Sequence, residues 1–247
     1  MLMNKALFSD FDGTLYFRDG MHQEDIEAIQ DFQSRGNQFA LCTGRPLGGV
    51  QALIKDKIKP DYYVLCTGGL VLDKDFNVVY AQSIPFETVK EVCDLYDQET
   101  IIGPHCLDPD YLYFAHVPNG APSYIKEFNS IDDFKNREIY SFSLIESSRA
   151  QEITNEINDR YLTLHAFQNV NAIDIVKRGC SKGEGILKLK ELINKETAGI
   201  GDSYNDLEMF RVVDYSFTFK SSPEDVQKQT RYVVSSIKEA IEILEEE

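Results

Sequence analysis

Residues 5–15 read KALFSDFDGTL, an apolar run that leads directly into two aspartates and a glycine. The run 5–9 predicts a short buried strand, and the polar residues after it predict a turn. An amphipathic stretch follows at 22–35, and Gly36 is placed to end a helix. The opening of the chain is therefore predicted to be strand, turn and helix.

The same order of elements repeats along the chain. Residues 38–42 (QFALC) predict a second buried strand, 47–58 a helix, and 62–67 (YYVLCT) a third strand. The order returns after residue 177, with a helix at 181–195, strands at 197–201, 215–219 and 231–234, and helices from 205 and at 237–246. Strands that alternate with helices favour a parallel sheet, because parallel neighbours need a long return connection. We therefore expect an α/β fold, with a Rossmann-like parallel sheet core flanked by helices.

The stretch between these two runs has a different pattern. Residues 70–80 predict a hairpin around the turn-like DKDFN. From 83 to 176 the predicted elements are helices at 87–98 and 148–160 and strands at 139–145, 161–167 and 171–176. A segment of this length cannot be a loop inside a compact domain. We therefore expect one domain from residues 1–82 and 177–247, and an inserted α+β domain from 83–176.

The overall composition excludes several classes of partner. A formal net charge of −16, without a long Lys/Arg run, would repel nucleic acid and anionic lipid. No apolar stretch is long enough to span a bilayer, and residues 1–8 are too short and too soon followed by acidic residues for a signal peptide. The five cysteines are scattered without a C-x-x-C pair, which argues against disulfides and zinc. We expect a cytoplasmic protein, a monomer or small homo-oligomer, with no nucleic-acid or membrane partner.

Polar residues stand at four predicted element ends. They are Asp10 and Asp12 after the first strand, Thr43, Gly44 and Arg45 after the second, Lys182 at the start of the helix at 181–195, and Asp202, Asn205 and Asp206 after the strand at 197–201. Ligands of α/β sheets bind at the carboxyl ends of the strands, so we expect these residues to meet. Taken singly, an aspartate such as Asp10 is also typical of a turn or helix cap, and Lys182 of a solvated helix. Four such groups in one chain favour a shared site.

These four motifs, in this order, resemble those of phosphatases of the haloacid dehalogenase (HAD) superfamily, and of their Cof-type branch (class IIB). In that branch a large cap domain is inserted after the third core strand. The resemblance covers the whole chain, and its most specific part is DFDGT at 10–14 with GDSYND at 201–206. It implies a catalytic core from 1–82 and 177–247 and a cap from 83–176. The implied activity is Mg²⁺-dependent hydrolysis of a small phosphorylated metabolite, such as a sugar phosphate, nucleotide or cofactor phosphate, through an aspartyl-phosphate intermediate.

The carboxylates suit this chemistry for a physical reason. A phosphate ester repels an attacking carboxylate, and a Mg²⁺ ion bound to both removes much of the repulsion. We expect Asp10 to be the nucleophile and a metal ligand. Asp12 is expected to act as general acid and then base and, by the resemblance, to bind the metal through its backbone carbonyl. Asp202 would complete the protein ligands, with Asp206 behind it holding water or Lys182.

The remaining candidates suit the phosphoryl group. Thr43 offers a hydroxyl and Gly44 a backbone N–H to the phosphoryl oxygens. The resemblance implies that Lys182 bonds both the nucleophile and the phosphate. Asn205 would support its loop or touch the phosphate. Arg45 is expected either to contact the substrate or to form a salt bridge.

One departure and two alternative functions remain open. Where the family commonly has Asn-Gly-Ala after the third strand, residues 67–69 read TGG, which puts in doubt any contact made by that Asn. A phosphotransferase or mutase would share the aspartyl-phosphate if a sugar hydroxyl captured the phosphoryl group. A receiver-type signalling protein also places acidic residues and a Lys around an aspartate. Asp12 argues against the receiver, because an acid/base there should speed the loss of the phosphoryl group.

Overall fold

The computed structural model describes residues 4–54, 56–98, 100–145, 147–169 and 171–247. Residues 1–3, which belong to the predicted first domain and to the stretch compared with a signal peptide, lie outside the described residues. Residue 55 of the predicted helix 47–58 does so too. Within the described ranges, none of the helices is both long and apolar enough to cross a bilayer.

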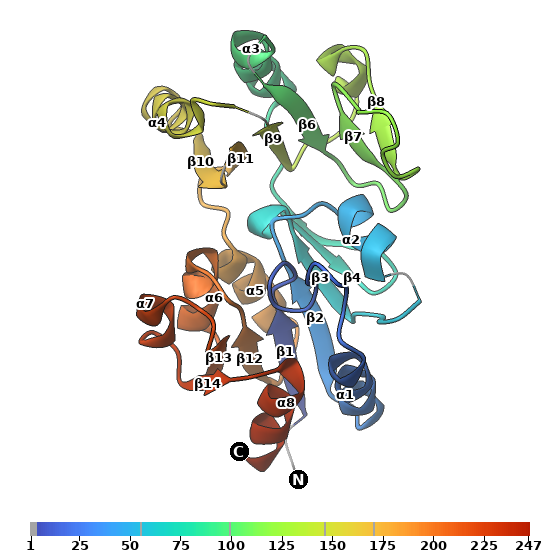
Figure 1. The fold of residues 1–247 in the computed structure, drawn as a ribbon, viewed down its shortest axis with the longest axis vertical. Coiled ribbons are helices and arrows are strands. Elements are labelled where there is room, and N and C mark those ends of the chain that lie inside the picture. The colour runs from blue at the N-terminus through green and yellow to red at the C-terminus, as the bar shows by residue number, and fades with distance from the viewer. Residues whose placement is uncertain (1–3, 55, 99, 146, 170) are drawn as a thin grey trace. The chain divides into compact units, whose positions relative to one another are not determined.

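The chain divides into two compact units (Figure 1). The first unit comprises the segment that ends at Thr43, Asp56–Tyr80 and Ser181–Glu247. The second comprises Ala81–Cys180 and the short segment that begins at Gly44. This short segment joins the second unit because it packs closely there: a Cβ on Gly48 would lie 2.3 Å from the carbonyl oxygen of Tyr111. The assignment of 83–176 as an inserted cap stays a prediction.

The first unit is built on one sheet of eight strands, in the order β14-β13-β12-β1-β2-β3-β4-β5. Its strands are β1 Lys5–Ser9, β2 Gln38–Cys42, β3 Tyr62–Leu65, β4 Leu70–Asp73, β5 Val78–Ala81, β12 Glu196–Ile200, β13 Tyr215–Phe219 and β14 Tyr232–Val234. Its helices are α1 Gln23–Ser34, α5 Lys182–Lys190, α6 Leu207–Val212, α7 Glu224–Gln227 and α8 Ile237–Glu246. Strands β14 to β3 pair in parallel, and β4 pairs antiparallel with β3. The predicted α/β fold with a central parallel sheet and flanking helices is confirmed.

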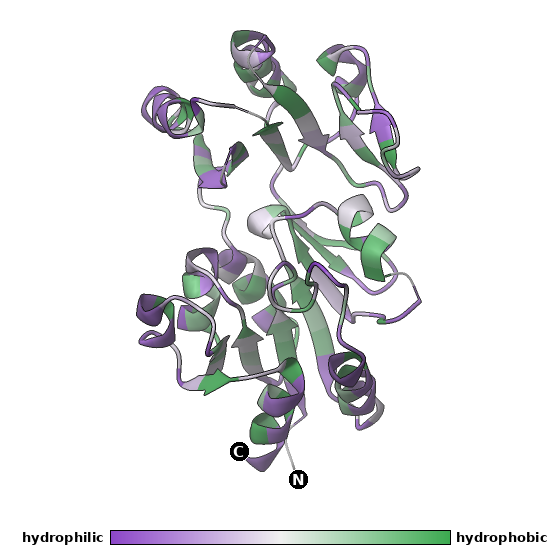
Figure 2. Ribbon diagram, viewed as in Figure 1, coloured by the Kyte–Doolittle hydropathy of each residue, from purple (hydrophilic) through white to green (hydrophobic). Residues whose placement is uncertain are grey.

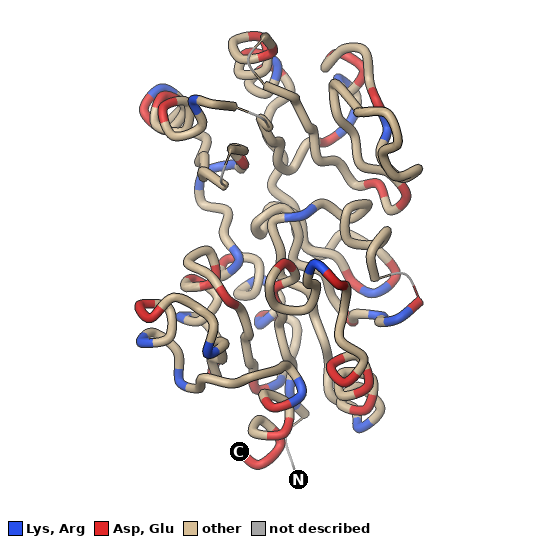
Figure 3. Tube along the Cα trace, in the orientation of Figure 1, with Lys and Arg blue, Asp and Glu red and all other residues tan. Residues whose placement is uncertain are grey.

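Alternate residues of the strands face opposite sides of this sheet. Ala6 and Phe8 of β1 share one core with Ile186 and Leu189 of α5. Helices α1 and α8 contact each other, α1 also contacts β2, and α8 also contacts β12. Because apolar side chains leave on both faces, the inner residues of β1 and β2 are apolar, and green predominates along them (Figure 2). Acidic residues instead recur along α1 and α8 (Figure 3).

The second unit contains a sheet of four strands, in the order β10-β11-β9-β6, and a pair, β7-β8. Its strands are β6 Ile101–His105, β7 Leu112–Phe114, β8 Ile125–Glu127, β9 Ser141–Ile145, β10 Leu164–Asn169 and β11 Ala172–Lys177. Its helices are α2 Leu47–Ile54, α3 Phe86–Tyr96 and α4 Ala150–Arg160. One apolar core joins one face of the larger sheet to α3 and α4.

Several element boundaries differ from the sequence expectations; two of them, and one strand that was not predicted, have a local explanation. The helix predicted at 47–58 ends at Ile54, because the chain must turn to enter β3. The strand predicted at 161–167 begins at Leu164, because the N–H of Tyr161 still bonds to Ile157 at the end of α4. Strand β6 was not predicted, since its Gly-Pro pair is typical of a loop; its edge position tolerates the proline.

Candidate active site

The candidate site lies at the carboxyl ends of the central strands of the first unit. Asp10 directly follows β1, Thr43 follows β2, and Asp202 comes shortly after β12. Parallel pairing of β1 with both β2 and β12 brings these ends together. The N–H of Asp10 donates to the Ile200 carbonyl at 2.9 Å, which joins the end of β1 to the end of β12.

Lys182 is the buried positive charge of this site. Its Nζ donates to Oδ1 of Asp10 and to Oδ1 of Asp206, each at 2.6 Å, and its side chain is only 1% exposed. Ser181 caps α5, since its Oγ accepts from the N–H of Glu184 at 3.1 Å, and the cap fixes where the helix presents Lys182. The alternative of a solvated helix lysine is therefore wrong.

Asp206 holds the loop after β12. Its Oδ2 accepts from the N–H groups of Asp202 and Ser203, both at 3.0 Å, while its other oxygen bonds to Lys182. Close packing accompanies these bonds, because a Cβ on Gly201 would lie 2.3 Å from the Asp206 carboxyl carbon. This fully buried carboxylate therefore ties the position of Asp202 to that of Lys182.

The carboxylates offer a place for a divalent cation. Oxygens of Asp10, Asp202 and Asp206 all lie within 4.8 Å of one another. When ionised, these three carboxylates carry −3 against +1 on Lys182, which leaves −2, the charge that one divalent cation offsets. Because both oxygens of Asp206 already accept hydrogen bonds, Asp10 and Asp202 are the better ligands. Carboxylate oxygens are what Mg²⁺ prefers, so the residues fit this ion.

Local structure holds Asp202 in place. The hydroxyl of Thr14 donates to its Oδ1 at 3.3 Å. Gly13, with φ of +78°, leaves space beside it, since a Cβ at that position would lie 2.7 Å from Oδ2 of Asp202. Gly13 and Thr14 of the DFDGT motif therefore hold Asp202 in position, although Asp202 lies far along the chain.

Burial and like charge raise the pKa values of Asp10 and Asp202. Burial raises the pKa of Asp10 to about 8, with the charge of Lys182 opposing it and that of Asp206 adding to it. Burial alone would lower the pKa of Lys182, but Asp10 and Asp206 raise it above its ordinary value. Burial also raises the pKa of Asp202. A bound divalent cation would favour the ionised carboxylates and lower their pKa values.

A family model described as a haloacid dehalogenase-like hydrolase matches residues 7–241. The chain belongs to this family. A 5-amino-6-(5-phospho-D-ribitylamino)uracil phosphatase from Bacillus subtilis is 25% identical, over 94% of this chain and 93% of its own length. Its similarity extends along both units.

Two solved structures share the fold. A haloacid dehalogenase-like hydrolase from Bacteroides thetaiotaomicron has a TM-score of 0.86 at 20% identity, covering 98% of this chain and 99% of its own. A sugar phosphatase of HAD subclass IIB has a TM-score of 0.76 at 21% identity, covering 98% of each chain. The resemblance to Cof-type HAD phosphatases is confirmed, and the chain is a hydrolase of the phosphatase type.

The other predicted site residues of this HAD chain differ in burial and in the unit to which they belong. Thr43 is buried; its N–H donates to the Val64 carbonyl at 2.8 Å, and its carbonyl accepts from Thr67. The side chains of Asp12 and Asn205 are exposed. Gly44 and Arg45 directly follow Thr43 in the chain, at the start of a segment that groups with the second unit, and their roles stay predictions.

The sequence reasoning missed the conformation of the turn after β3. Cys66, Thr67 and Gly68 all have positive φ, at 52°, 52° and 83°. A Cβ on Gly68 would lie 1.9 Å from the carbonyl oxygen of Ser181, the cap of α5. The turn thus supports Thr43, whose carbonyl accepts from the N–H of Thr67, and it packs against Ser181 at the start of α5. Only the paired glycines at 68–69 signal it, because Cys and Thr rarely adopt positive φ.

Proposed function

We propose that this chain is a Mg²⁺-dependent phosphatase that hydrolyses a small phosphorylated metabolite, such as a sugar, nucleotide or cofactor phosphate, through an aspartyl-phosphate on Asp10. The observation that carries the proposal is the buried Lys182, bonded at 2.6 Å to both Asp10 and Asp206 beside a carboxylate cluster that fits a divalent cation. The ammonium orients the Asp10 carboxylate and favours its ionised form, and a bound divalent cation would favour that form further, as a nucleophile requires.

The first chemical step forms a bond between an oxygen of Asp10 and phosphorus. The bond from phosphorus to the substrate alcohol breaks, and Asp12 gives its proton to the leaving oxygen. Asp12 lies two residues after the nucleophile, and its exposed side chain is open to a leaving group and to water. Mg²⁺, held by Asp10, Asp202 and the backbone carbonyl of Asp12, would offset the negative charge of the phosphate oxygens.

The second step returns the enzyme to its starting form. Asp12, now ionised, takes a proton from water; the water oxygen bonds to phosphorus, and the bond from phosphorus to Asp10 breaks. Lys182 stays bonded to the nucleophile and, with Thr43, Gly44 and Asn205, contacts the phosphoryl oxygens. Inorganic phosphate leaves, and both aspartates regain their original protonation states.

Several expectations stay predictions. Arg45 is proposed to contact the substrate. The relative from Bacillus subtilis is named for a phosphorylated ribityl compound, which supports a small metabolite as the substrate class. We also propose a cytoplasmic location, no nucleic-acid partner, and a monomer or small homo-oligomer.

The test is phosphate release from a panel of phosphorylated metabolites, with Mg²⁺, with EDTA, and with Asp10→Asn. We expect activity that is lost both with EDTA and in the variant. Asp19→Asn serves as the matched control, because Asp19 is an exposed carboxylate of the same loop region and should leave activity unchanged. Release that survives in Asp10→Asn would refute the mechanism; phosphorylation of Asp10 that persists without release would favour the signalling alternative.

A further inference from the structure

The turn after β3 has an uncommon backbone conformation. Cys66, Thr67 and Gly68 have φ values of 52°, 52° and 83°, in the left-handed region. Glycine enters this region freely, whereas a β-branched residue such as Thr67 is strained there. Strain of this kind persists only where the surrounding structure holds it, and it is concentrated at functional sites. The contacts of Thr67 indicate what the strain achieves.

The N–H of Thr67 points to the opposite side from the one that a regular strand would give it. Along an extended strand, the backbone groups of successive residues point alternately to the two neighbouring strands. The Val64 carbonyl faces β2, because it accepts from the N–H of Thr43 at 2.8 Å. Thr67 lies three residues further on, so its N–H would face β4 if β3 continued. Instead, it donates to the Thr43 carbonyl at 3.1 Å, on the β2 side. A φ of 52° in place of the extended value of about −120° rotates this peptide group by nearly half a turn.

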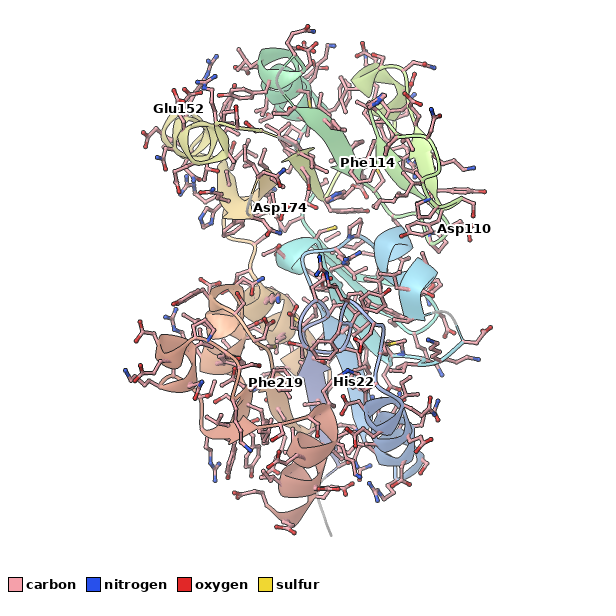
Figure 4. The ribbon with its side chains drawn as sticks, in the orientation of Figure 1. His22, Asp110, Phe114, Glu152, Asp174 and Phe219 are labelled. Atoms are coloured by element: carbon pink, nitrogen blue, oxygen red, sulfur yellow. The ribbon has the colours of Figure 1, made fainter. Side chains whose placement is uncertain are left out.

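The bond to Thr43 sets the direction of a second donor. A trans peptide unit is planar, so the N–H of Gly44 lies in the plane of the Thr43 carbonyl and points the opposite way. Since the carbonyl faces Thr67, the Gly44 N–H faces away from β3. Strand β2 lies between β3 and β1, so this is the side on which Asp10 follows β1. These strands end at the same edge of the sheet as β13, whose last residue, Phe219, is labelled in Figure 4.

The N–H of Gly44 is available to a ligand. Gly44 is exposed, and within the described ranges no residue accepts a hydrogen bond from its N–H. A backbone donor stabilises charge in a reaction most effectively when its direction is already set before the substrate reacts. The turn at 66–68 provides this, because it holds the other end of the same peptide unit.

Packing on the far side of the turn keeps the strained conformation in place. A Cβ on Gly68 would lie 1.9 Å from the carbonyl oxygen of Ser181, the cap of α5. The turn is therefore confined between this cap and the Thr43 carbonyl. It cannot relax away from one without moving into the other.

We propose that Thr67 is a positioning residue for phosphoryl transfer, whose N–H holds the Thr43–Gly44 peptide so that the Gly44 N–H is aimed at the phosphoryl oxygens. The inference rests on the proposed function, which makes Gly44 a donor to these oxygens, and adds that the strained turn aims it. A donor set for the geometry of the transferring group acts in the transition state more than in the bound substrate, so its loss should lower kcat more than it changes KM.

The test deletes the Thr67 N–H alone. The α-hydroxy acid analogue of threonine, introduced at position 67 of the full chain, replaces the N–H by an ester oxygen and keeps the side chain. We expect kcat for Mg²⁺-dependent phosphate release to fall by about 10-fold or more, with KM changed by less than about 3-fold. Thr67→Gly is the rescue variant, because it keeps the N–H and adopts positive φ without strain; its kcat should exceed that of the ester by about 5-fold or more.

Phe76 offers a closely matched control. It too has positive φ, at 63°, and its N–H donates to the Asp73 carbonyl at 3.1 Å. Its turn lies at the opposite edge of the sheet, because Asp73 pairs with Tyr62 at the start of β3. The corresponding ester at Phe76 should lower the melting temperature to a similar extent and leave kcat unchanged.

A further measurement does not require a folded variant. In ¹⁵N-labelled wild type, the Gly44 amide proton should shift downfield when orthovanadate is added with Mg²⁺, because the N–H then donates to an anionic oxygen. No shift would overturn the proposal.

The kinetic outcomes are equally decisive. A Thr67 ester with wild-type kcat, an effect on KM alone, an equal loss in the Phe76 ester, or Thr67→Gly no faster than the Thr67 ester would overturn the positioning role. Asp10→Asn separates the two proposals. Release that survives in it would refute the proposed function and the positioning role together, whereas release that needs Asp10 but not the Thr67 N–H would refute the positioning role alone.

Discussion

Replacing Lys182 with Met is expected to have a cost that depends strongly on pH. The side chain is buried and its ammonium lies 2.6 Å from carboxylates of both Asp10 and Asp206. Met keeps the length and apolar stem of the side chain but leaves the two carboxylates without this partner. Removing one partner of a buried ion pair costs about 3–5 kcal/mol, because a buried charge is left uncompensated.

Protonation limits this cost at low pH. Without Lys182 the pKa of Asp10, already raised to about 8, rises further. Between about pH 4, where the unfolded carboxyl titrates, and that raised value, the folded variant holds more protons than the unfolded chain, so its stability falls as pH rises. We expect a loss of about 3–5 kcal/mol near pH 9 and a clearly smaller loss near pH 5.

Urea unfolding in EDTA at the two pH values measures the effect without interference from metal binding. Lys190→Met is the matched control on the same helix, because Lys190 is partly exposed and bonds to the Val212 carbonyl at 2.9 Å. It should cost about 1 kcal/mol or less at either pH. If the loss of unfolding free energy in Lys182→Met does not change with pH, or does not exceed that of Lys190→Met, the buried ion pairs of Lys182 with Asp10 and Asp206 do not contribute as described.

Three other outcomes concern the metal, the turn and the nucleophile. Asp202→Asn should raise the Mg²⁺ concentration for half-maximal phosphate release by about 10- to 100-fold, and an unchanged midpoint would count against this ligand. Gly68→Ala should lower the free energy of unfolding by more than about 3 kcal/mol, because the added Cβ would lie 1.9 Å from the carbonyl oxygen of Ser181. The control Gly20→Ala, at a glycine that also has positive φ but lies in open space, should lower it by about 1–2 kcal/mol. Equal losses for the two variants in urea unfolding would contradict this. Metal-free protein should lose stability from about pH 4 to about pH 8, because folding raises the pKa of Asp10, and Mg²⁺ should flatten this slope; melting curves that rise over this range would oppose it.

Much of the first unit could be predicted from sequence because local patterns there agree with the tertiary structure. Strand β1 has a buried apolar centre, Ala6 to Phe8, as strands covered on both faces require, and the run 5–9 matches β1 in both bounds. Strand β6 could not be found this way, since Gly103 and Pro104 favour a loop and only the pairing with β9 makes them a strand. The grouping of α2 with the second unit depends on a backbone contact at Gly48, which no periodicity encodes.

The site, too, could be predicted in part from the sequence, while the rest depends on tertiary contacts. The rule that ligands bind at strand ends was enough to nominate Asp10, Asp202 and Lys182 together. From the sequence, Asp206 is expected behind Asp202, holding water or Lys182, and the bond to Lys182 is the one observed. The sequence could not indicate that Asp206 also holds the loop of Asp202, because these bonds depend on how the chain turns after β12.

The covalent intermediate is the central claim, and trapping it is the most direct test. Protein mixed with a substrate and Mg²⁺ would be quenched in acid, digested, and examined by mass spectrometry for a phosphoryl group on the peptide that contains Asp10. We predict modification of Asp10 that appears before the steady state, is released by hydroxylamine, and is absent with EDTA. Phosphate release at full rate with no modified Asp10, or with the group on another residue, would contradict the mechanism.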